Sequence, residues 1–119
     1  VAAAHDAAAR VRASPGELRF DAVEFWRRPE ILCLVAREVP PPLADLVAQL
    51  RAALAAQGFE PETRPFRPHV TLARKVTQPV PTAPFEPLGW PVAEFALVES
   101  ITDRSGSIYT PLASWPLHA

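Results

Sequence analysis

The chain has 119 residues, of which 49% are hydrophobic and 21% are charged, and its formal net charge is −1. This length and composition are typical of one compact soluble domain with a real core. The near-neutral charge argues against broad electrostatic binding to a nucleic-acid backbone, which needs a basic surface, but leaves recognition of a single RNA end open.

The chain contains one cysteine, Cys33, which lies inside an apolar run and cannot form an internal disulfide. We interpret it as a small buried hydrophobic residue, and its reduced state predicts a cytoplasmic protein. No run of 18 apolar residues and no signal-peptide pattern is present, so we expect neither membrane insertion nor export. The chain lacks methionine and begins Val-Ala-Ala-Ala. We therefore interpret it as a fragment of a protein that extends upstream.

The first half of the chain predicts one helix and two strands. Residues 2–13, rich in alanine and arginine, predict a helix that a Ser-Pro-Gly sequence ends. Residues 17–26 alternate apolar and polar side chains with a phase slip near Ala22, which predicts a strand with a bulge or twist. Residues 27–30 predict a turn, and the apolar run at 31–36 predicts a central strand.

The second half begins with a helix. Three prolines at 40–42 open it, apolar residues then recur at helical spacing, and Gly58 fits a C-terminal cap. An extended segment leads to a strand at 69–75, and residues 76–91 predict a proline-rich loop.

Two further strands are predicted at residues 92–101 and 108–117, joined by a hairpin turn. Two strands before the second helix and three after it favour an α+β fold with a largely antiparallel sheet. We expect that helix to cover one face of the sheet. The strand at 69–75 then presents its polar side chains on the other, concave face.

The candidate site lies in the segment 66–74, which reads Phe-Arg-Pro-His-Val-Thr-Leu-Ala-Arg. Because side chains alternate along a strand, His69 and Thr71 project from one face about 6–7 Å apart. The imidazole can transfer a proton near neutral pH, and the hydroxyl can bind an oxyanion. This pair suits chemistry at phosphorus. For His69 alone, the alternative is a half-buried strand histidine that only satisfies a hydrogen bond.

This segment resembles the second His-x-Thr-x motif of the two-histidine phosphoesterases, and in particular that of the LigT-like RNA 2′,3′-cyclic phosphodiesterases, also called 2′-5′ RNA ligases. The stretch from Ser100 to Leu117 is similar to that family's closing hairpin, and the resemblance covers nearly the whole chain. It implies a bilobal α+β fold with antiparallel sheet lobes and helices on the outer face. Residues 1–119 then form a single domain that is incomplete at its N-terminus.

The resemblance implies metal-independent hydrolysis of 2′,3′-cyclic phosphate ends of RNA or small nucleotides to 2′-phosphates, with 2′-5′ ligation as the reverse reaction. It assigns His69 as the proton acceptor, Thr71 as its catalytic and phosphate-binding partner, and Arg74 as a substrate-binding residue near the phosphate. Strict alternation points Arg74 to the opposite face, with Val70, so its role requires a twist or the end of the strand. No cofactor is expected, and the sequence shows no cluster of metal ligands.

Only one of the family's two His-x-Thr motifs is present. His5 is followed by Asp-Ala and His118 by a single alanine, so we interpret both as exposed histidines without a catalytic task. We expect the fragment alone to be inactive and the second catalytic histidine to lie upstream of Val1. The alternative is a non-catalytic nucleotide- or RNA-binding module of the same fold. The sequence leaves the oligomeric state open.

Overall fold

A computed structural model describes residues 2–78 and 84–118, which divide into two compact units. Each unit is built from segments that are distant in sequence. Unit 1 consists of the described residues of Val1–Gly16, Pro41–Arg64 and Val92–Ala119, and unit 2 of those of Glu17–Pro40 and Pro65–Pro91.

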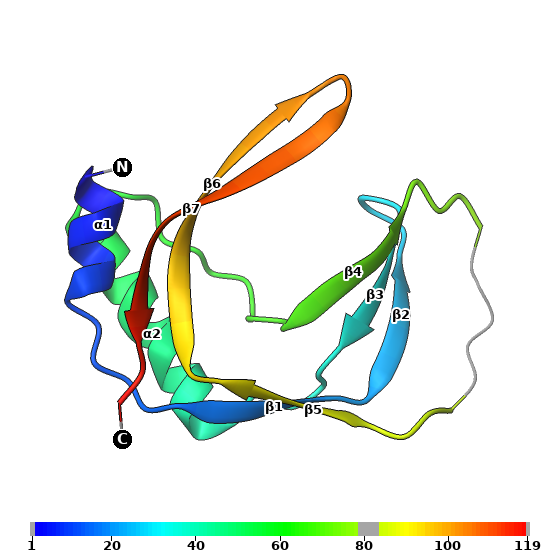
Figure 1. Cartoon of the computed structure of the whole chain (residues 1–119), viewed down its shortest axis with the longest axis horizontal. Helices are drawn as coiled ribbons and strands as arrows, with labels where there is room; N and C mark the ends of the chain where they lie inside the picture. The colour runs from blue at the N-terminus through cyan, green and yellow to red at the C-terminus, as the bar shows by residue number, and fades with distance from the viewer. Residues whose placement is uncertain (1, 79–83, 119) are drawn as a thin grey trace. The chain divides into compact units, whose positions relative to one another are not determined.

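Two helices and antiparallel strands make up the described chain, which confirms the predicted α+β class (Figure 1). No helix among residues 2–78 and 84–118 is both long and apolar enough to span a lipid bilayer. In chain order the elements are α1 (Ala2–Ala9), β1 (Gly16–Phe20), β2 (Ala22–Trp26), β3 (Ile31–Val35), α2 (Pro41–Ala56), β4 (His69–Arg74), β5 (Leu88–Val92), β6 (Glu94–Asp103) and β7 (Gly106–Pro116).

The main sheet of unit 2 has three antiparallel strands in the order β2-β3-β4, as Figure 1 shows. The apolar run predicted as a central strand is indeed β3, the middle strand. Its alternate residues Ile31, Cys33 and Val35 are buried and form a small core with Ala22 and Trp26. This core supports the face of the sheet that carries the candidate site.

The strand predicted over residues 17–26 is two strands that belong to different sheets, so its prediction as one element is wrong. The break falls at Asp21, next to the phase slip. There the Asp21 backbone N–H donates to the Val35 carbonyl at 3.0 Å, and its carboxylate accepts from the backbone and side chain of Arg37. Asp21 therefore directs the chain from β1 into β2.

Strand β5 was predicted as part of the loop at 76–91, and this prediction is wrong for its last residues. Among the strands of the described residues, β5 pairs with β1 alone, and the buried Phe20 packs edge to face against Trp90, with ring centroids 6.2 Å apart. The sequence pattern does not indicate this strand, because Gly89 and Pro91 are residues that usually mark loops. Proline is also tolerated only at the edges of sheets. Residues 79–83 of the predicted loop lie outside the described residues.

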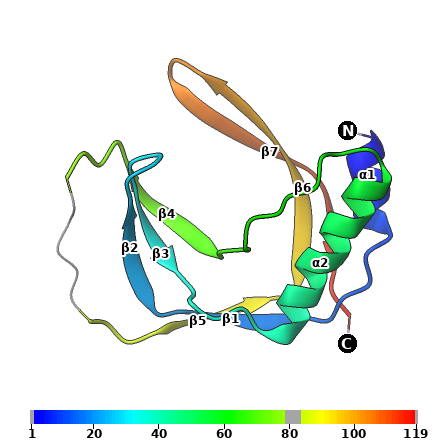
Figure 2. The same ribbon diagram turned by 180° about the vertical axis from the view of Figure 1, so that it is seen from behind.

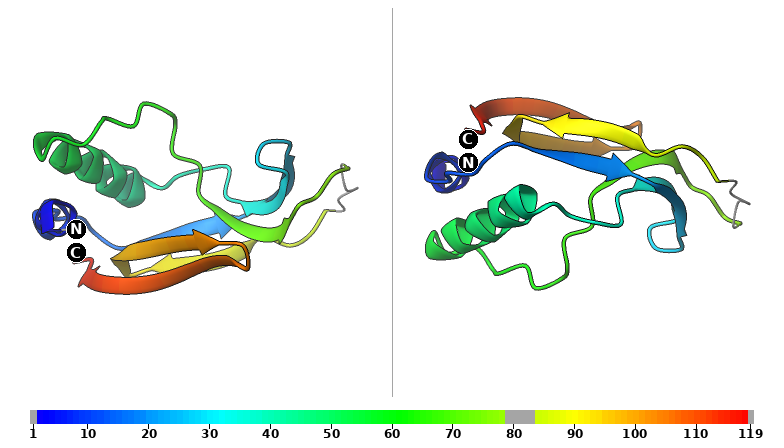
Figure 3. Two further views of the ribbon diagram at one scale, coloured as in Figure 1. Left: turned by 90° about the horizontal axis from the view of Figure 1, so that it is seen from above. Right: turned by 90° about the horizontal axis from the view of Figure 1, so that it is seen from below.

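The two helices of unit 1 lie side by side, with α1 also contacting β6 and β7 (Figures 2 and 3). Helix α1 ends at Ala9, earlier than predicted, and the Arg12 guanidinium donates to the carbonyls of Ala9 and Val11 beyond its end. Helix α2 ends as predicted, with Gly58 at a φ of 94°. Helix α2, which we expect from the sequence to cover the sheet of the motif strand, belongs to unit 1, whereas the motif strand β4 belongs to unit 2.

Strands β6 and β7 form a long hairpin that extends further than predicted, because its turn is shorter. Asp103 accepts hydrogen bonds from the backbone and hydroxyl of Ser105, at 2.8 and 2.6 Å. Gly106 then adopts a φ of 124°, a conformation that favours glycine. These interactions close the turn directly after Asp103.

Candidate functional site

The candidate site is built on the edge strand β4, whose pairing with β3 determines which side chains share a face. His69 lies opposite Val35, and Thr71 lies opposite Cys33. Directly opposed residues of neighbouring strands point to the same face of a sheet. His69 and Thr71 therefore stand on the face that holds the small core of unit 2. The His69 side chain is exposed, and Thr71 is half-buried at the edge of that core.

A β-bulge alters the alternation in the second half of β4. Cys33 pairs with Thr71, but Leu32 pairs with Ala73, so Leu72 is an extra residue without a direct partner. The extra residue shifts the phase of the strand, and Arg74 comes to lie opposite Ile31. Arg74 therefore joins the face of His69 and Thr71, and the bulge supplies the departure from strict alternation that its predicted role requires.

The ring of His69 is held at Nδ1, which lies 2.9 Å from the carbonyl oxygen of Arg67. A carbonyl oxygen can only accept, so Nδ1 carries the hydrogen of this bond. In a neutral imidazole this leaves Nε2 as the nitrogen that can take up a proton. The ring also contacts Trp26, with centroids 4.6 Å apart.

Glu24 of β2 lies on the same face, opposite Cys33, and its side chain connects two neighbours of His69. Its Oε1 accepts from the Trp26 indole N–H at 3.0 Å and from the Arg67 guanidinium. The Trp26 hydrogen bond, followed by Arg67, lowers the pKa of Glu24 below its usual range, although partial burial acts in the opposite direction. Glu24 therefore stays ionised through neutral and mildly acidic pH.

This lowered pKa predicts how acid affects stability. Because the pKa of Glu24 is lower in the folded than in the unfolded protein, its carboxylate stabilises the fold above the unfolded-state pKa. That contribution is lost as the pH falls through the folded-state pKa. We expect the melting temperature of the wild type to exceed that of Glu24→Gln near neutral pH, and the difference to shrink below about pH 5.

Thermal unfolding of both proteins across a pH series measures this difference, with Glu60→Gln at an exposed position as the matched control. A difference between wild type and Glu24→Gln that stays constant from neutral to acidic pH would contradict the assignment.

Cys33 is free and fully buried beneath this face, as predicted from its apolar run. Burial raises the pKa of its thiol, while the neighbouring Thr71 hydroxyl and the positive charges of Arg67 and Arg74 act in the opposite direction. The thiol therefore stays protonated at neutral pH. Cys33 acts as a small packing residue that allows Thr71 and Glu24 to stand on either side of it.

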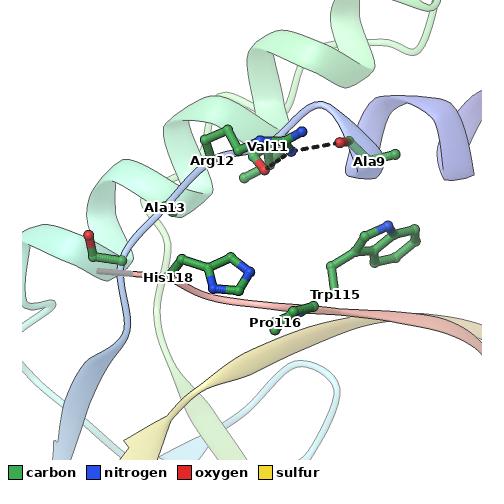
Figure 4. A pocket seen from close by; sticks show the side chains of 8 residues that line it. Ala9, Val11, Arg12, Ala13, Trp115, Pro116 and His118 are labelled. Atoms are coloured by element: carbon green, nitrogen blue, oxygen red, sulfur yellow. Dashed lines mark hydrogen bonds between the residues drawn. The ribbon is translucent and has the colours of Figure 1, made fainter.

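The other two histidines belong to unit 1, whereas the motif strand belongs to unit 2. His5 is exposed and packs edge to face on Trp115, with ring centroids 5.1 Å apart. His118 is also exposed and lines a pocket with Trp115 and Arg12 (Figure 4). The Arg12 guanidinium is engaged by two backbone carbonyls there. The expectation that neither histidine has a catalytic task stays a prediction.

Glu24 and Trp26 could not be predicted as neighbours of the site, because they are more than 40 positions from His69 along the chain. The signal available was the alternation of Ala22, Glu24 and Trp26, which puts these residues on one face of β2. Only the antiparallel order β2-β3-β4 shows that this face continues to His69.

The chain is similar in sequence and in fold to known proteins. An RNA 2′,3′-cyclic phosphodiesterase of Escherichia coli is 36% identical over 112 residues, which cover 92% of this chain and 63% of the relative. The chain thus spans less than two thirds of that relative's length. A crystal structure of a phosphoesterase matches with a TM-score of 0.86 and 33% identity, over 99% of this chain and 68% of the other.

The structure of E. coli LigT complexed with 3′-AMP matches with a TM-score of 0.83 and 33% identity, over 98% of this chain and 67% of that chain. A family model described as LigT like Phosphoesterase matches residues 34–109, a stretch that includes β4 and its His-x-Thr. Because this match covers more than half of the residues, the chain belongs to the LigT-like phosphoesterase family.

Proposed function

We propose that the intact protein hydrolyses 2′,3′-cyclic phosphate ends of RNA or small nucleotides to 2′-phosphates without a metal ion. The observation that carries this proposal is the bulged pairing of β3 with β4, which gathers His69, Thr71 and Arg74 on one face. The E. coli relative is named an RNA 2′,3′-cyclic phosphodiesterase, and E. coli LigT has been crystallised with a nucleotide, 3′-AMP.

Each of the three residues has a role in the proposed reaction. A water oxygen forms a bond to phosphorus while the bond from phosphorus to the ribose 3′-oxygen breaks. His69 takes the proton of the attacking water at Nε2, because its Nδ1 is already engaged. The Thr71 hydroxyl and the Arg74 guanidinium donate to the non-bridging oxygens, where negative charge concentrates in the transition state.

The departing 3′-oxygen requires a proton from a second group. Among the 119 residues, His-Val-Thr at 69–71 is the one His-x-Thr sequence, and neither His5 nor His118 is followed by a threonine two positions on. We therefore place the second catalytic histidine in a part of the protein outside these residues. When a ribose 5′-hydroxyl takes the place of water, the same two groups can support 2′-5′ ligation of RNA ends: the 5′-oxygen forms the bond to phosphorus, and the 3′-oxygen leaves with a proton from the second group. The free thiol of Cys33 supports a reducing, cytoplasmic setting.

The test compares the intact protein with residues 1–119 alone on a 2′,3′-cyclic nucleotide, with a chelator present and the product followed by ³¹P NMR. We expect the intact protein to form the 2′-phosphate and the 119-residue chain to show no turnover. Full turnover by the shorter chain would overturn the placement of the second histidine. Binding of 3′-AMP by the intact protein without turnover would instead support the alternative, a non-catalytic nucleotide-binding module.

A further inference from the structure

The contacts around His69 form a closed cycle that runs through four residues of the sheet and the segment before β4. The first contact is the hydrogen bond from His69 Nδ1 to the Arg67 backbone carbonyl. The Arg67 guanidinium lies over the Trp26 indole, 4.9 Å from the ring centroid, and Trp26 in turn contacts the imidazole. Glu24 accepts hydrogen bonds from both Trp26 and Arg67 and so connects these two neighbours of His69.

This arrangement anchors the carbonyl that determines the tautomer of His69. Arg67 lies in the segment that leads into β4, and its side chain is tied to β2 through Glu24 and Trp26. The next residue, Pro68, is buried and accepts from the Ala36 backbone N–H at 3.2 Å. The Arg67 carbonyl is therefore held between a side-chain anchor and a backbone anchor.

We propose that Glu24, Trp26 and Arg67 are positioning residues that hold the His69 imidazole in its Nδ1–H tautomer and so reserve Nε2 for proton transfer. This proposal rests on the function proposed above. A tautomer is selected by the hydrogen bond that the other ring nitrogen makes. Loss of the Glu24 anchor frees the Arg67 side chain, and the carbonyl beside it can then move away from Nδ1.

The expected effect is on the chemical step, not on substrate binding. Misplacing a catalytic group by an ångström costs about 10²-fold in rate, and a partly released imidazole should cost less. We expect Glu24→Ala to lower kcat about tenfold at unchanged KM. Arg67→Lys should act in the same direction, because an ammonium keeps the charge but loses the planar group that stacks on Trp26.

The experiment is carried out on the full-length protein that contains this chain, with ¹⁵N-labelled histidine. His69→Ala identifies the signals of His69, and the two ring-nitrogen shifts report its tautomer. We expect Nδ1 to carry the hydrogen in the wild type. In Glu24→Ala the share of the Nε2–H form should rise, together with the fall in kcat.

The matched control is Glu62→Ala, which removes the exposed ion pair of Glu62 with Arg64 in unit 1 and should change neither readout. An Nε2–H tautomer in the wild type would overturn the proposal, as would a Glu24→Ala protein indistinguishable from Glu62→Ala. If Glu24→Ala does not fold, Glu24→Gln keeps an acceptor for Trp26 and should show a smaller shift in the same direction.

The tautomer readout also separates this proposal from the proposed function. A wild type with the expected tautomer, shifted in Glu24→Ala, supports the positioning role even if the protein hydrolyses no cyclic phosphate. That combination would overturn the proposed function alone.

Discussion

Replacing His69 by alanine in the intact protein should slow hydrolysis of a 2′,3′-cyclic nucleotide by about 10²–10⁴-fold, the usual contribution of a general acid or base. The side chain is exposed on the edge strand, so its removal leaves the buried residues of β3 in place. The fold should therefore survive. Steady-state kinetics measures the change in kcat, and circular dichroism of the variant confirms that it is folded.

His118→Ala is the matched control for this substitution, because His118 is also exposed but lies in unit 1. Its rate should equal that of the wild type. An unaltered rate in His69→Ala would remove His69 from the mechanism, whatever the control shows.

Replacing Thr71 by valine should lower kcat by about 10²-fold, because a single donor to a developing oxyanion contributes on this scale. Valine has nearly the shape of threonine, so it keeps the volume of the side chain opposite the buried Cys33 and replaces the hydroxyl by a methyl group. The loss should fall mainly on kcat, since charge on the non-bridging oxygens grows in the transition state.

The control is Thr63→Val at an exposed position of unit 1, which should leave the kinetics unchanged. If Thr71→Val raised KM and left kcat intact, Thr71 would bind the ground state alone and would not stabilise the transition state.

Much of the fold follows from local patterns in the sequence. The apolar run at 31–36 has the length and composition of a buried strand, and helix α2 combines prolines in its first turn with a glycine cap. Strand β5 could not be predicted in this way, because its pairing with β1 is a long-range contact made by a segment with glycine and proline. The division of residues 17–26 between two sheets likewise depends on the contacts of Asp21 with Val35 and Arg37.

The candidate site was predictable in its centre and not at its edges. His69 and Thr71 are two positions apart in a strand, so alternation alone places them on one face. Arg74 could not be placed, because the bulge at Leu72 is visible only in the pairing with β3. Glu24 and Trp26 could not be predicted as neighbours of His69 either, since this requires knowing the order β2-β3-β4 of the sheet.

The extra residue in β4 has a consequence for comparing or redesigning chains of this kind. Histidine and arginine five positions apart would diverge on a regular strand, and they converge here only because Leu72 adds one step. A designer who transfers His69, Thr71 and Arg74 to a regular strand must therefore separate the histidine and the arginine by an even number of positions. The alternative is to transfer the β-bulge at Leu72 as well. Conversely, when a histidine and an arginine of a related site are an odd number of positions apart in the sequence, a β-bulge is to be expected between them.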